Sequence, residues 1–149
     1  GIPQEDRLYH HKLHAALAYA RVNGLNRVTM GGAGARVGIV SAGKAYQDVL
    51  QALMGLGIDD ARARALGLKV LKIGMTWPLD PEVVREFAQG LDTLVVIEEK
   101  RPVLEEQVRS ALYGTPHQPA IVGKHFAGHP FDAARAPMAI PNAGESNPA

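Results

Sequence analysis

The chain has 149 residues, a length that suits a single domain. Its hydrophobic fraction is 46% and its charged fraction is 21%, as in ordinary folded proteins, and its formal net charge of +1 disfavours nucleic acid as a partner. No stretch approaches the ~20 apolar residues of a membrane span, and the absence of cysteine excludes disulfides and Cys-ligated zinc or iron–sulfur clusters within this chain.

Two further features concern the cellular setting. A chain without cysteine is consistent with a cytoplasmic protein, and we expect that location. The first residue is Gly1 rather than Met, and no charged-then-apolar signal segment follows it. Such a start fits a domain taken from a longer protein, although processing or a cloning remnant would look the same.

Helical periodicity predicts a first helix over 6–22, because Leu13, Ala16, Leu17 and Ala20 lie on one face. The remaining elements are predicted in this order: strands at 27–30 and 36–40, helices at 44–56 and 59–66, a strand at 69–73, a helix that Asp80 caps, Pro81 opens and Gly90 closes, a strand at 93–97, a helix opened by Pro102 and closed by Gly114, and a strand at 120–122. Apolar strands that alternate with helices indicate an α/β fold whose mostly parallel sheet is covered on both faces.

The last part of the chain has a different composition. From about residue 124 onward it is rich in Pro, Ala, Gly and Asn and shows little periodicity. We therefore predict a folded domain at 1–124, including the N-terminal helix, and a Pro/Gly/Ala-rich tail or linker at 125–149.

The nearest approach to a phosphate-binding motif is residues 38–45, which read G-I-V-S-A-G-K-A. Ala45 stands where a P-loop needs Ser or Thr to bind Mg²⁺. Gly38 also falls inside the predicted strand, so no free loop is left to curl around a phosphate. We favour a tight strand-to-helix turn in which Gly43 provides backbone freedom.

Four charged residues follow the predicted strand at 93–97: Glu98, Glu99, Lys100 and Arg101. Ligand sites of open α/β sheets gather at the carboxyl ends of the strands, where two carboxylates can perform acid–base chemistry. The same carboxylates precede a helix N-terminus, which stabilises negative charge. We favour a structural or interface role for the four residues.

Trp77 is the only tryptophan and lies in the loop after the strand at 69–73. Tryptophan is enriched at interface hot spots, so Trp77 is a candidate contact residue. Packing beneath the following helix explains its presence equally well, and the sequence leaves both interpretations open.

The chain offers no convincing catalytic or metal-binding constellation. His10, His11 and His14 have helical spacing, but no glutamate or third ligand accompanies them in a metalloprotease pattern. Ser41 has no evident base. We predict no catalytic, cofactor-binding or metal-binding residue in this chain.

Four segments in this order and spacing resemble one family: 25–29, 38–46, 71–79 and 95–101. Together they are similar to the middle portion of indolepyruvate ferredoxin oxidoreductase and its fused bacterial relatives, within the 2-oxoacid:ferredoxin oxidoreductases. The resemblance covers roughly residues 6–125.

The resemblance implies a transketolase C-terminal-like fold, a three-layer α/β/α domain with a five-strand mixed sheet whose first strand is antiparallel. From the residues alone, the segment 27–30 would form a hairpin with 36–40. The resemblance places it beside 69–73 instead, and we follow the resemblance.

The resemblance also implies a function for the parent enzyme. In such enzymes, neighbouring domains bind thiamine diphosphate and Mg²⁺, iron–sulfur clusters pass electrons to ferredoxin, and coenzyme A receives the acyl group. We expect no cofactor in this chain, which would be an accessory domain that contacts other domains or subunits and is inactive alone. Its expected interface residues are Trp77, Glu98, Glu99, Lys100 and Arg101.

Two alternatives stay open. The chain is alternatively a free-standing anion or small-molecule binding or regulatory module that uses Lys44 at a helix start. A plain interaction domain without a ligand is the other alternative.

Overall fold

A computed structural model describes residues 1–124 of the chain. The helices are α1 (Ile2–Arg7), the π-helical turn η1 (Leu8–Lys12), α2 (Leu13–Val22), α3 (Gly43–Gly55), α4 (Asp60–Leu66), α5 (Pro81–Ala88) and α6 (Val103–Leu112). The strands are β1 (Arg27–Met30), β2 (Val37–Ala42), β3 (Leu68–Ile73), β4 (Thr93–Ile97) and β5 (Ala120–Val122). Within these residues no helix is long and apolar enough to cross a membrane. The predicted tail at 125–149 lies outside the described residues.

The five strands form one mixed sheet in the order β1-β3-β2-β4-β5. Strands β2 to β5 are parallel, whereas β1 pairs antiparallel with β3 through Arg27↔Lys72 and Val28↔Leu71. The placement of β1 beside β3, which the family resemblance implied, is therefore confirmed. The hairpin suggested by sequence proximity does not form, because β3 occupies the position between β1 and β2.

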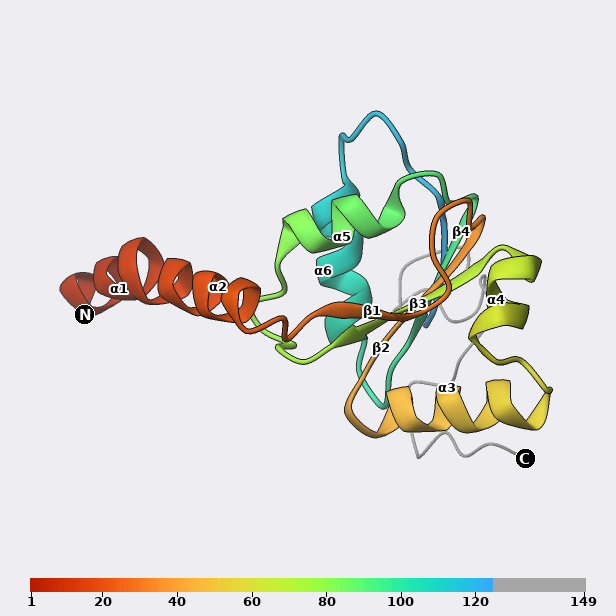
Figure 1. The fold of residues 1–149 in the computed structure, drawn as a ribbon. Coiled ribbons are helices and arrows are strands. Elements are labelled where there is room, and N and C mark those ends of the chain that lie inside the picture. The colour runs from red at the N-terminus through yellow and green to blue at the C-terminus, as the bar shows by residue number, and fades with distance from the viewer. Residues whose placement is uncertain (125–149) are drawn as a thin grey trace, which may run out of the picture.

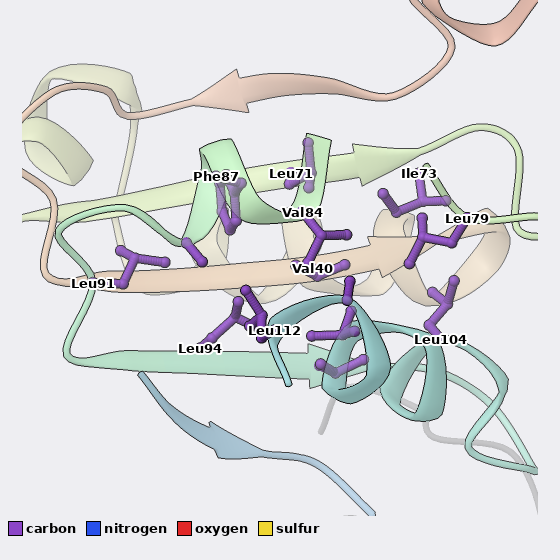
Figure 2. Packing of buried hydrophobic residues seen from close by; sticks show 14 of the residues in the cluster. Val40, Leu71, Ile73, Leu79, Val84, Phe87, Leu91, Leu94, Leu104 and Leu112 are labelled. Carbon is purple, nitrogen blue, oxygen red and sulfur yellow. The ribbon is translucent and has the colours of Figure 1, made fainter. Parts of the chain in front are cut away.

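Helices cover both faces of the sheet, as Figure 1 shows. On one face, α5 and α6 pack over the larger core cluster, part of which is drawn in Figure 2. The buried residues of this cluster are Ala35, Val40, Leu71, Ile73, Leu79, Val84, Phe87, Ala88, Leu91, Leu94, Val96, Leu104, Val108, Ala111 and Leu112. On the other face, Tyr46, Val49 and Leu53 of α3 pack against Val70 of β3. The result is the predicted three-layer α/β/α arrangement.

Most predicted boundaries agree with the structure to within one or two residues. Asp59 caps α4, and Gly67 ends it in the left-handed conformation. Strand β2 runs to Ala42 rather than ending at residue 40, and α3 starts at the next residue. Gly43 makes this loopless junction with a φ of 55°, a conformation that glycine adopts without steric cost.

The N-terminal helical arm, residues 2–22, differs from the prediction. It starts at residue 2 rather than 6, and η1 interrupts its α-helical pattern. The arm extends away from the sheet in Figure 1, and Ala20 is its only buried residue.

Arg21 joins the arm to the domain. Its Nε and Nη2 donate to Asp80 Oδ2 and Oδ1 at 2.5 and 2.8 Å. Asp80 is buried, and it also accepts from Glu82 N as the N-cap of α5. One carboxylate thus completes a helix N-terminus and holds a segment that lies 59 residues earlier.

The Arg21–Asp80 pair predicts a dependence of stability on pH. The hydrogen bonds from Arg21 hold the pKa of Asp80 below its ordinary value of 3.8. A carboxyl whose pKa is lower in the folded state stabilises the protein above its unfolded pKa and loses that contribution as the pH falls through the folded value. Replacing Arg21 with Ala should therefore lower the urea midpoint at neutral pH and flatten its fall in acid, below about pH 4.

Arg36→Ala is the matched control, because Arg36 makes the same forked contact with Asp92, whose side chain is 59% exposed. Solvent screens such a pair, so the control should leave the acid profile close to that of the unmodified chain. An acid profile of the Arg21→Ala variant that matches the unmodified chain would contradict the assignment.

Candidate functional site

The β2–α3 junction and the loops after β3 and β4 meet at the carboxyl edge of the sheet and surround a hollow of about 510 Å³. The lining residues are Ala42, Gly43, Lys44, Ala45, Thr76, Glu98, Glu99, Lys100, Arg101, Val103 and Leu104. The chain leaves β2 toward α3 on one face, and it leaves β3 and β4 toward α5 and α6 on the other. The hollow therefore lies at a topological switch point, where open α/β sheets bind their ligands.

The β2–α3 junction does not have the shape of a phosphate loop. Gly38 lies inside β2, as predicted, and its packing explains the glycine: an added Cβ would lie 2.5 Å from Leu91 Cδ1 and 2.7 Å from Phe87 Cε1. Because α3 begins directly after β2, no loop is available to wrap a phosphate.

Lys44, the one basic residue in the first turn of α3, has carboxylate partners within the chain. Its Nζ lies 2.9 Å from Asp48 Oδ2 and 3.4 Å from Glu99 Oε1. The Asp48 hydrogen bond is the largest cause of the raised pKa of Lys44. The second contact, with Glu99, is an ion pair that acts in the same direction. An incoming anion would have to compete with both carboxylates.

Glu98 occupies the N-terminus of α6. Its Oε2 accepts from Leu104 N at 2.7 Å, and its Oε1 accepts from Glu105 N at 2.9 Å. Only 7% of Glu98 is exposed, and this burial raises the pKa of its carboxyl, while the two amides act in the opposite direction. The helix end that could attract a phosphate already holds an anion from the protein itself.

The neighbouring charges are more accessible. Glu99 is half-buried, whereas Lys100 and Arg101 are exposed at the rim of the hollow. Lys100 has a φ of 55°, so the chain turns sharply between β4 and α6. The structure thus places the four predicted charged residues side by side, but they have different roles. Glu98 caps α6, Glu99 pairs with Lys44, and Lys100 and Arg101 face solvent.

Trp77 lies 59% exposed in the loop between β3 and α5, so it does not pack beneath the following helix. The loop itself is held in place. Asn26 Oδ1 accepts from Gly74 N at 3.0 Å, and Gln107 of α6 accepts from Leu79 N at 2.8 Å and donates to Thr76 O at 2.9 Å. A large apolar side chain is therefore presented from a fixed backbone next to the hollow, which Thr76 lines.

Two charged residues near this edge were not singled out from the sequence. Glu105 pairs with Arg109 one turn later at 2.7 Å, and Glu105 is fully buried. Lys124 is also buried, and burial is the largest cause of its lowered pKa, which Glu98 and Glu105 partly offset. A helical wheel gives a signal for Glu105, since it lies three residues before Val108 and seven before Leu112, on the buried face.

The residues of this edge do not fit a diphosphate and its magnesium ion. Within residues 1–124, no group of three or more His, Cys, Asp or Glu side chains is placed to hold a metal. The Glu98 carboxylate accepts hydrogen bonds from the first amides of α6, and Lys44 pairs with Asp48 and Glu99. We therefore assign no step of thiamine chemistry to these residues.

This arrangement predicts that the 149-residue chain binds neither inorganic phosphate nor ATP. Calorimetric titration should give no saturable heat with either, because Glu98 occupies the N-terminus of α6 and Asp48 and Glu99 engage Lys44. Lys100 and Arg101 face solvent at the rim, where screening weakens their attraction for an anion. Saturable ATP binding that disappears in a Lys44→Ala variant would show that the junction at 38–45 binds nucleotides after all.

The family model and the relatives that match this chain point to the same family. The family model described as the indolepyruvate oxidoreductase domain matches residues 27–140, well over half of the chain. The indolepyruvate oxidoreductase subunit IorA of Methanothermobacter thermautotrophicus is 35% identical over 111 residues, covering 72% of this chain and 17% of that protein. The IorA subunit of Pyrococcus abyssi is 40% identical over 75 residues, covering 50% of this chain and 10% of that protein.

A solved structure agrees at the level of the fold. The 2-oxoglutarate:ferredoxin oxidoreductase from Magnetococcus marinus, with 2-oxoglutarate, coenzyme A and succinyl-CoA bound, is similar with a TM-score of 0.51 and 18% identity, over 70% of this chain and 18% of that chain. The chain spans at most about a sixth of the length of the two IorA subunits. On the strength of the family match, the chain belongs to the indolepyruvate oxidoreductase domain family.

Proposed function

We propose that this domain is an accessory element of a thiamine-dependent 2-oxoacid oxidoreductase of the indolepyruvate type and that it contacts neighbouring domains or subunits. One observation carries the proposal. At the switch point where such sheets bind ligands, the protein's own carboxylates already engage the α6 amides and Lys44, while Trp77 stands exposed beside it. An edge of this kind suits a protein contact better than a cofactor.

The chemistry of the parent enzyme belongs to other parts of it in this proposal. Thiamine diphosphate with Mg²⁺ would stabilise the carbanion left after a 2-oxoacid loses carbon dioxide. Iron–sulfur clusters would carry the electrons to ferredoxin, and coenzyme A would accept the acyl group. The domain at 1–124 would support this assembly without reacting, the segment 125–149 would act as tail or linker, and the enzyme would work in the cytoplasm.

The proposed contact surface is the carboxyl edge, defined by Trp77, Glu98, Glu99, Lys100 and Arg101. Trp77 supplies a large apolar side chain on a fixed loop, as interface anchors do. Lys100 and Arg101 are exposed at the rim and provide charged contacts around that anchor. Glu98 and Glu99 would support this surface indirectly, because Glu98 holds the first turn of α6 in place and Glu99 pairs with Lys44.

Replacing Trp77 with Ala in the intact parent enzyme should weaken assembly. Losing a tryptophan hot spot costs about 2 kcal/mol, which corresponds to roughly 30-fold in the dissociation constant. Sedimentation or native mass spectrometry over a dilution series measures this change, and the melting temperature of the 149-residue variant shows whether the domain itself remains folded.

Tyr113→Ala is the matched control. Tyr113 is an aromatic residue that is 88% exposed, and it follows α6 at the opposite, amino edge of the sheet. The proposal expects this variant to assemble normally. Equal assembly of the Trp77→Ala and Tyr113→Ala enzymes would remove the carboxyl edge as the contact surface.

A further inference from the structure

Strand β5 has little strand pairing to hold it on the sheet. It comprises three residues and, within residues 1–124, pairs only with β4 and forms one edge of the sheet. Its side chains are exposed or partly buried, and Ile121 is its one member that packs against the main core. A strand this short is marginal without other contacts.

Glu105 supplies the missing contact. Its buried carboxylate lies in the first turn of α6, where Oε2 accepts from Lys124 N at 2.6 Å. Its Oε1 accepts from Arg109 Nε and Nη2 at 3.0 and 2.7 Å, and Arg109 Nη2 also reaches Ile121 O at 3.3 Å. Both ends of the segment 121–124 are therefore attached to one charged pair on α6.

The backbone of Gly123 passes directly over the same carboxylate. A Cβ at position 123 would lie 2.6 Å from Glu105 Oε2 and 2.8 Å from its Cδ. Only glycine leaves room for this approach. Because Glu98 caps the same turn of α6, the carboxyl edge and the exit of the chain from β5 share one structural support.

We propose that Glu105 is a clamp that holds β5 and the residues leaving it on the domain, and that removing its charge releases 120–124 as a local unit. Glutamine cannot replace it. Whichever way the side-chain amide of a Glu105→Gln variant is turned, its NH₂ group faces either the Lys124 amide or the Arg109 guanidinium, so a donor meets a donor. The main core contains no buried β5 residue, so it should remain intact when the clamp fails.

Hydrogen exchange of the 149-residue chain tests the clamp with a Glu105→Gln variant. The amides of 120–124 should exchange at least about tenfold faster, since a buried hydrogen bond to a charged group is lost. Those of β2, in the centre of the sheet, should keep their rates. Glu106→Gln is the matched control, because Glu106 lies in the same turn, carries the same charge and is exposed; it should change neither set.

A Gly123→Ala variant tests the clamp from the backbone side, because its added methyl group would clash with Glu105 Oε2 while the charge of Glu105 stays in place. It should reproduce the fast exchange at 120–124, and it decides the question if Glu105→Gln does not fold. Unchanged exchange at 120–124 in either folded variant would overturn the proposal. Equal acceleration of 120–124 and β2 would do the same, since it would make Glu105 a general stability residue.

Discussion

The first turn of α6 organises this molecule, because its free amides need an acceptor and Glu98 supplies one from the end of β4. That contact places a buried carboxylate at the carboxyl edge. The next residue of the same loop, Glu99, pairs with Lys44 at the start of α3, and Glu105 of the same turn binds the backbone beyond β5. Three neighbouring strand ends are thereby connected around one helix start, and the amides of that start and Lys44 are engaged by the protein's own carboxylates.

The periodicity of the chain was sufficient to predict most of the fold. Strands β4 and β5 lie at the predicted residues, and Asp80 caps α5 as expected. Local patterns did not give the position of β1, because its partner β3 follows some forty residues later; the family resemblance gave it. The π-helical turn of the N-terminal arm was missed, since apolar spacing does not distinguish one extra residue per turn.

The site was harder to predict than the fold. The sequence indicated that residues 98–101 gather at the carboxyl edge, but their separate roles depend on distances that only the folded chain shows. Arg21 and Asp80 are 59 residues apart, and no local pattern joins them. The burial of Lys124 depends on the path of the chain after β5, which periodicity does not describe. The sequence allowed Trp77 either to pack under the following helix or to contact a partner, and its exposure in the structure excludes packing under α5.

The central claim is that the carboxyl edge contacts another part of a larger oxidoreductase. Hydrogen exchange of this domain, compared between the free 149-residue chain and the assembled parent enzyme, tests the claim most directly. Our account predicts protection at 74–77 and 98–101 on assembly and unchanged exchange at 113–117, beside the amino edge. Protection at 113–117 alone, or no protection at either edge, would contradict it.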